Sequence, residues 1–125
     1  MNCKICKIIP KKVIENKLGE EGEPTSKGLN KLEKIGGYTN DRFDEYLKKC
    51  PSCGTYYLYT YHDSFESGGA VTATTERITT NEAKKVIKEI LEELNSKKSD
   101  RYASDLDKLN KELKKLQTER KKRPN

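Results

Sequence analysis

The four cysteines of this 125-residue chain form two pairs of identical spacing, Cys3-x-x-Cys6 and Cys50-x-x-Cys53. Two thiols three positions apart can come from one tight turn, here called a knuckle, and two knuckles supply the four sulfurs of a tetrahedral metal site. In the second pair, Pro51 sets φ for the first turn position, and Gly54 can adopt a positive φ without steric cost. Four ligands leave no open coordination position, which makes such a site structural. We therefore predict one structural Zn²⁺ ligated by Cys3, Cys6, Cys50 and Cys53.

The second knuckle, CPSCG, resembles that of zinc-ribbon and treble-clef proteins, which carry C-P-x-C-G. The first pair matches less well, because Lys7 follows it instead of glycine. The two pairs are separated by 43 residues, whereas about 15–20 is commoner, so the segment around residues 19–28 is interpreted as a loop within an insertion. The resemblance implies the same four cysteine ligands. Rubredoxin-type iron, disulfides and a redox-active dithiol are the alternatives to zinc, and a thioredoxin-like site is disfavoured because neither pair opens a helix in a βαβ unit.

Composition indicates a small core that needs additional stabilisation. Hydrophobic residues make up 32% of the chain and charged residues 37%, against a usual ~45–50% and ~25%. A metal that closes a long loop is one common solution in small domains. No apolar signal segment and no run of about 18 apolar residues is present, so we expect an intracellular, cytoplasmic protein with no membrane partner.

The predicted fold class is α+β: a zinc-stapled antiparallel sheet over residues 1–78, a helical hairpin over 79–122 packed on it, and a basic tail over 123–125. Segments Thr55–His62 and Ala70–Ile78 have the β-rich composition of a two-stranded hairpin. Asp41–Cys50 fits either a helix or a strand, and we prefer a strand because it leads into a knuckle. A strand or short hairpin is expected over Cys3–Lys12, and a short helix over Ser26–Ile35 that ends at the next two glycines.

Two helices are predicted after the sheet. Thr79 and Glu82 form a capping box, and the helix that follows has one apolar face, formed by Ala83, Val86, Ile87, Ile90, Leu91 and Leu94. The segment 95–100 interrupts this pattern, and the second helix has a narrow apolar seam, formed by Tyr102, Leu106, Leu109, Leu113 and Leu116. A short break between helices of similar length predicts an antiparallel hairpin. The seam could pack within the chain, against a second copy or against another protein.

Partner binding is predicted at two places. Tyr57, Tyr59 and Tyr61 alternate onto one face of their strand. The second helix is basic through Lys111, Lys114, Lys115, Arg120, Lys121 and Lys122. We expect a non-enzymatic module that binds a protein through these features. Nucleic-acid binding by the basic helix with tyrosine stacking is the alternative from another class, and a cysteine redox switch is a third.

No catalytic constellation emerges from the sequence. His62 is the only histidine and has no recognised nucleophile motif beside it, so it is expected to be an ordinary surface residue. The neighbouring carboxylates Glu92 and Glu93, and likewise Asp105 and Asp107, fall on helix positions expected to be solvated. We therefore expect no enzymatic activity.

Overall fold

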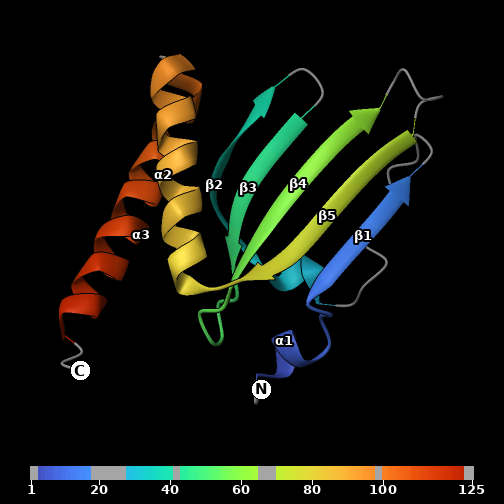
Figure 1. The fold of residues 1–125 in the computed structure, drawn as a ribbon, viewed down its shortest axis with the longest axis horizontal. Helices are drawn as coiled ribbons and strands as arrows, with labels where there is room; N and C mark the ends of the chain where they lie inside the picture. The colour runs from blue at the N-terminus through green and yellow to red at the C-terminus, as the bar shows by residue number, and fades with distance from the viewer. Residues whose placement is uncertain (1–2, 18–27, 41–42, 65–69, 98–99, 123–125) are drawn as a thin grey trace.

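The computed structural model describes residues 3–17, 28–40, 43–64, 70–97 and 100–122. Most of the predicted loop at 19–28, and the tail at 123–125, lie outside these residues. Five antiparallel strands form one sheet in the order β1-β5-β4-β3-β2, with two long helices after it (Figure 1). The strands are β1 (Lys12–Lys17), β2 (Glu33–Asn40), β3 (Phe43–Lys49), β4 (Tyr56–Ser64) and β5 (Ala70–Ile78). The α+β prediction is confirmed.

The hairpin of β4 and β5 is the one predicted from composition, and it pairs Tyr56 with Ile78 at the end nearest the cysteines. The preference for a strand before the second knuckle is also confirmed, because β3 pairs with β4 along its whole length. Alternation along β4 places Tyr56 and Tyr57 on opposite faces of the sheet. These two residues belong to two separate cores, one on each face.

Helices α2 (Thr80–Lys97) and α3 (Ala103–Lys122) form a hairpin, with a 3₁₀ turn at Asp100–Tyr102 between them. They cover the face of the sheet that carries Tyr56, with α2 over β2, β3 and β4 and α3 over β2 (Figure 1). The capping box is confirmed: the Glu82 N–H donates to Thr79 Oγ1, and the Thr79 N–H donates to the Glu82 carboxylate, each at 3.1 Å. The predicted apolar face supplies the buried residues Ala83, Ile87, Ile90 and Leu94.

The seam of α3 packs within the chain. Tyr102, Leu109 and Leu116 are buried in the same core as Leu47 of β3, while Leu106 and Leu113 are partly buried against it. The expectation that Asp105 is solvated was wrong. Asp105 is half-buried rather than solvated, because its carboxylate accepts a hydrogen bond from the Gly37 N–H at 3.1 Å. This contact fastens α3 along the edge strand of the sheet.

The helix predicted over Ser26–Ile35 is wrong. Among the described residues of that segment, only a 3₁₀ turn at Leu29–Lys31 forms, and β2 then includes both Gly36 and Gly37. The two glycines allow close packing on opposite faces of the sheet. A Cβ on Gly36 would lie 2.9 Å from Leu109 Cγ, so its absence lets α3 approach the strand, whereas a Cβ on Gly37 would overlap the Tyr46 ring and the Glu45 carbonyl. Glycine here provides close approach rather than a helix stop.

The strand or hairpin expected over Cys3–Lys12 is also wrong. The one-turn helix α1 (Lys4–Lys7) occupies its start, and β1 begins only at Lys12. The physical reason lies in the spacing of the cysteines. Positions i and i+3 point to opposite faces of a strand but to one side of a helical turn. The Lys7 N–H donates to the Cys3 carbonyl at 2.9 Å, which closes this turn.

Candidate metal centre

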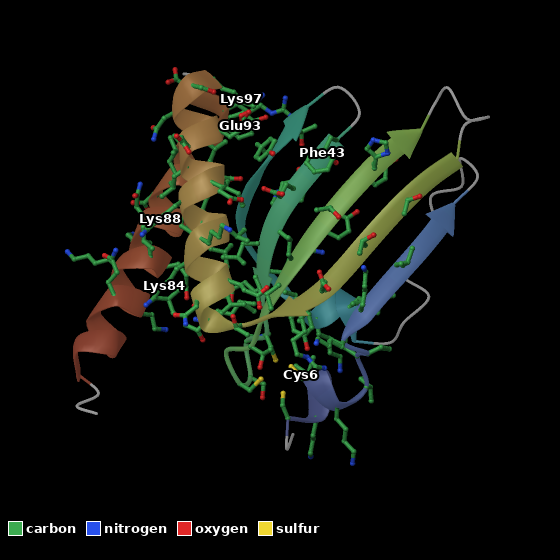
Figure 2. The ribbon with its side chains drawn as sticks, in the orientation of Figure 1. Cys6, Phe43, Lys84, Lys88, Glu93 and Lys97 are labelled. Carbon is green, nitrogen blue, oxygen red and sulfur yellow. The ribbon has the colours of Figure 1, made fainter. Side chains whose placement is uncertain are left out.

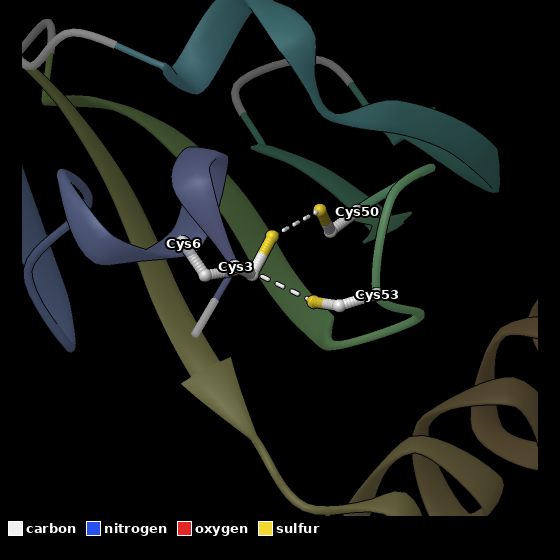
Figure 3. A group of neighbouring side chains, drawn as sticks. All are labelled: Cys3, Cys6, Cys50 and Cys53. Carbon is white, nitrogen blue, oxygen red and sulfur yellow. Dashed lines mark hydrogen bonds between the residues drawn. The ribbon is translucent and has the colours of Figure 1, made fainter. Parts of the chain in front are cut away.

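The four cysteine sulfurs meet at one end of the sheet. All four Sγ atoms lie within 4.8 Å of one another, with Cys3 and Cys50 separated by 3.6 Å and Cys6 and Cys53 by 3.4 Å (Figure 3). In a regular tetrahedron with metal–sulfur bonds of about 2.3 Å, neighbouring sulfurs are about 3.8 Å apart. The cluster therefore has the donor set and spacing of a four-coordinate metal site. The predicted convergence of both pairs is confirmed.

The second knuckle joins β3 to β4 and has the predicted turn geometry. The Gly54 N–H donates to the Cys50 carbonyl, and the Cys50 N–H donates to the Thr55 carbonyl, both at 2.9 Å. Gly54 has φ of +80°, which a side chain would disfavour. Together these bonds position Cys50 and Cys53 on one tight turn. Cys50 is fully buried, whereas Cys53 is exposed.

The first knuckle comes from α1, with Cys3 at its N-cap and Cys6 inside it. The backbone N–H of Cys6 is directed at the Cys3 sulfur and lowers the pKa of Cys3 to about 6. Burial raises the pKa of the Cys6 thiol to about 12. At Cys53, burial acts to raise the pKa, but hydrogen bonds from the Thr55 hydroxyl and backbone outweigh it and lower the pKa overall. At Cys3 and Cys53 the structure thus directs N–H and O–H donors at sulfur, which favours the thiolate form of these two ligands.

Tyr57 is part of this centre, although the sequence placed it on a partner-binding surface. Its side chain is fully buried beside the cysteines. Burial, together with its hydrogen bond to Cys6, raises the Tyr57 pKa to about 12. Arg77 Nε donates to the Tyr57 hydroxyl at 3.3 Å, and Arg77 Nη2 donates to the carbonyls of Cys6 (3.3 Å) and Ile9 (2.9 Å). Tyr57 and Arg77 therefore fix the position of α1 and its sulfur, a role that no motif in the sequence signalled.

An apolar cluster surrounds the inner sulfurs. Cys6 and Cys50 are packed with Tyr57 and with the buried side chains of Ile9, Val13, Leu29 and Leu32. These residues come from three separate segments of the chain. A site enclosed in this way excludes water from two of its four sulfurs, which strengthens the electrostatic attraction between a cation and its thiolates.

Lys49, next to the second knuckle, connects the centre to α3. Its Nζ lies 2.9 Å from the Glu112 carboxylate, to which the Tyr56 hydroxyl also donates. Burial acts to raise the pKa of Glu112, but the hydrogen bonds from Tyr56 and Lys49 prevail and hold it below its usual value. A hollow of about 570 Å³ opens beside this contact, between the second knuckle and the helices.

Of the remaining predicted site residues, Lys115 lines the hollow beside Cys50 and Cys53. The sulfur cluster occupies one end of the sheet near Cys6, far from Phe43 at the other end (Figure 2). Tyr59 and Tyr61 are half-buried on the sheet. His62 is exposed, as expected, and its ring contacts Phe43. On α3 the side chains of Lys111, Lys114 and Lys115 are exposed, and those of Arg120, Lys121 and Lys122 lie outside the described part.

Comparisons with known proteins identify no relative. No family model, no curated protein and no solved structure matches the chain. Among the described residues, no helix is both long and apolar enough to cross a membrane.

Proposed function

We propose that this chain is a non-enzymatic interaction module whose sheet is held together by one structural Zn²⁺ bound to Cys3, Cys6, Cys50 and Cys53. The observation that carries the proposal is the convergence of four sulfurs within 4.8 Å of one another from two separate parts of the chain. Zinc is favoured because it prefers tetrahedral thiolate sites and its d¹⁰ shell requires no other geometry. The four ligands fill its coordination sphere.

The metal cross-link affects stability through the unfolded chain as well as through the folded one. Joining Cys6 to Cys50 through a metal closes a segment of 43 intervening residues. By the chain-entropy relation for cross-links, closing a loop of this length stabilises the folded state by about 4 kcal/mol. Native proteins have a total stability of only about 5–15 kcal/mol. Metal binding is therefore expected to decide whether the sheet end near α1 is folded.

Elemental analysis of the purified protein tests the metal directly, with about one zinc per chain expected. Cys50→Ser and Cys3→Ser should each lose the metal and the near-ultraviolet signal of ordered tyrosines together. The matched control is Ser52→Ala, since Ser52 is exposed between the two ligands of the same knuckle. It should retain both metal and signal.

Three results would overturn the proposal. A chelated, metal-free sample with unchanged tertiary structure would remove the structural role of the metal. Iron absorption in the visible range would replace zinc by an iron centre. Loss of all free thiols in a folded, metal-free protein would replace the metal by disulfides.

Two features that predicted binding to a protein partner instead pack against other parts of the same chain. The α3 seam packs on the sheet and α2, and Tyr57 is buried beside Cys6. The tyrosine-bearing face of the sheet beyond Tyr57 and the exposed lysines of α3, Lys111, Lys114 and Lys115, remain for a partner.

A further inference from the structure

Beyond Tyr57, the face of the sheet opposite α2 and α3 carries two neighbouring tyrosine rings. Tyr46 of β3 pairs with Tyr59 of β4, and their rings are stacked with centroids 6.1 Å apart and planes 21° apart. Both rings are half-buried. They lie outside the apolar cluster around the cysteines, so their side chains are not part of its packing.

Two contacts with β2 hold the Tyr46 ring in place. It lies against Gly37 of β2, where any side chain would overlap it. The Tyr46 hydroxyl is 2.7 Å from Thr39 Oγ1, also on β2. These two contacts with β2 position the Tyr46 ring before any ligand arrives. Preorganisation of this kind lowers the entropic cost of binding.

A lysine ammonium group lies over each of the two rings. Lys34 Nζ lies 3.9 Å from the Tyr46 ring centroid, and Lys48 Nζ lies 4.4 Å from that of Tyr59. Lys34 is exposed and Lys48 half-buried. On the same face, Asp44 lies two residues before Tyr46, opposite Tyr61 of β4. We call Lys34, Tyr46, Lys48 and Tyr59 the tyrosine–lysine platform.

We propose that the tyrosine–lysine platform binds single-stranded nucleic acid. Two adjacent rings accept two neighbouring bases by stacking, while lysines at the same rings neutralise the phosphates between them; this combination of aromatic and cationic groups is typical of single-strand binding surfaces. The lysine ammonium groups leave the ring faces as bases replace them and then pair with phosphate. A duplex keeps its bases stacked inside, so it cannot use the rings.

The platform depends on the proposed metal staple through the β3–β4 hairpin. Lys48 lies two residues before Cys50, and the second knuckle closes the hairpin that pairs Tyr46 with Tyr59. This inference therefore rests on the proposed function for its geometry. The two can fail separately, because metal content and oligonucleotide binding are measured on the same sample.

The test is fluorescence anisotropy of the metal-loaded, full-length protein with a short labelled oligouridylate, titrated at low salt and then at rising salt. Tyr59→Leu and Tyr46→Leu should each weaken binding about 5-fold to 100-fold, whereas Tyr59→Phe, which keeps the ring, should bind like the unmodified protein. The double variant Lys34→Ala/Lys48→Ala should weaken binding and reduce the slope of log K against log salt by about 1.4. Circular dichroism verifies that each variant is folded.

The matched control is Lys111→Ala/Lys114→Ala, which removes the same charge from α3 and should leave the affinity within about 2-fold, with at most a small change of slope. Equal losses from the two lysine pairs would assign binding to diffuse charge or to the basic helix. Equal affinity for a duplex, or for polyglutamate in place of the oligonucleotide, would overturn the assignment, the latter in favour of an acidic protein partner. If the metal-loaded protein does not bind the oligonucleotide, the inference about the platform is wrong and the proposed metal site is unaffected. If a folded, metal-free protein binds it, the structural role of the metal is wrong and the inference about the platform is unaffected.

Discussion

The substitution Tyr57→Phe removes one hydroxyl from beside the metal centre and changes little else. Tyr57 is fully buried, and its hydroxyl bonds to Cys6 and accepts a hydrogen bond from Arg77. Phenylalanine fills the same volume, so no large cavity forms. Arg77 keeps its bonds to the carbonyls of Cys6 and Ile9. The change therefore removes the hydrogen bond to the sulfur together with the one from Arg77 Nε, and leaves the other contacts of Arg77 in place.

The expected magnitude follows from the charge on that sulfur. A hydrogen bond to an ionised group is worth about 1.5–3 kcal/mol, and mutation of an outer-shell partner commonly weakens metal affinity about 10-fold to 100-fold. We expect Tyr57→Phe to bind zinc about 10-fold to 100-fold more weakly than the unmodified protein. Because metal binding is linked to folding, the melting temperature at limiting zinc should fall as well.

Competition with a chromophoric chelator measures this affinity, and the thiolate-to-metal absorption of the cobalt-substituted protein reports whether four sulfurs still bind. Tyr61→Phe is the matched control, since Tyr61 lies on the same strand and the same face but away from the cysteines. It should change zinc affinity by less than about 2-fold, as surface substitutions usually do. Equal affinities for Tyr57→Phe and the unmodified protein would refute the role assigned to the hydroxyl.

Three further predictions concern the helices. Gly36→Ala should destabilise the protein by about 1–3 kcal/mol in urea titration, because the new Cβ would lie 2.9 Å from Leu109 Cγ. Thr79→Ala should cost about 1 kcal/mol by losing the cap of α2. Folding lowers the pKa of Glu112, so its ionised carboxylate stabilises the folded protein. This stabilisation is complete above the pKa of Glu112 in the unfolded chain and is lost as pH falls through its pKa in the folded protein. The stability difference between the unmodified protein and Glu112→Gln should therefore be largest near neutral pH and shrink below about pH 4.5.

Each of these predictions has a result that contradicts it. Unchanged stability of Gly36→Ala would mean that α3 does not approach β2 as closely as described. A Thr79→Ala variant as stable as the unmodified protein would show that the cap is replaced by water. A stability difference for Glu112→Gln that is independent of pH would show that the contact with Lys49 does not stabilise the folded state through charge.

Local patterns along the chain were sufficient for much of the architecture. The capping box at Thr79, the apolar face of α2 and the β-rich segments of β4 and β5 each depend on residues close in sequence, whose preferences tertiary packing reinforced. The metal ligands were also predictable, because repeated C-x-x-C spacing reflects the geometry of one tight turn. Even the positive φ of Gly54 follows from the residue type and its place after the second cysteine.

Other features depended on contacts between distant segments. Gly36 and Gly37 look like a helix stop, and only the approach of α3 on one face and of Tyr46 on the other explains why both stand inside a strand. Tyr57 and Tyr59 are indistinguishable by alternation, since both point to the same face. Yet α1 and the 3₁₀ turn at Leu29–Lys31 cover the end of that face near the cysteines and bury Tyr57, while Tyr59 remains half-buried. By itself, then, the sequence determined which residues could ligate a metal, that β4 and β5 are strands, and that α2 and α3 are helices. Tertiary structure decided which tyrosine supports the sulfurs and which tyrosines are left for a partner, because burial is set by what packs above a side chain rather than by its position along the strand.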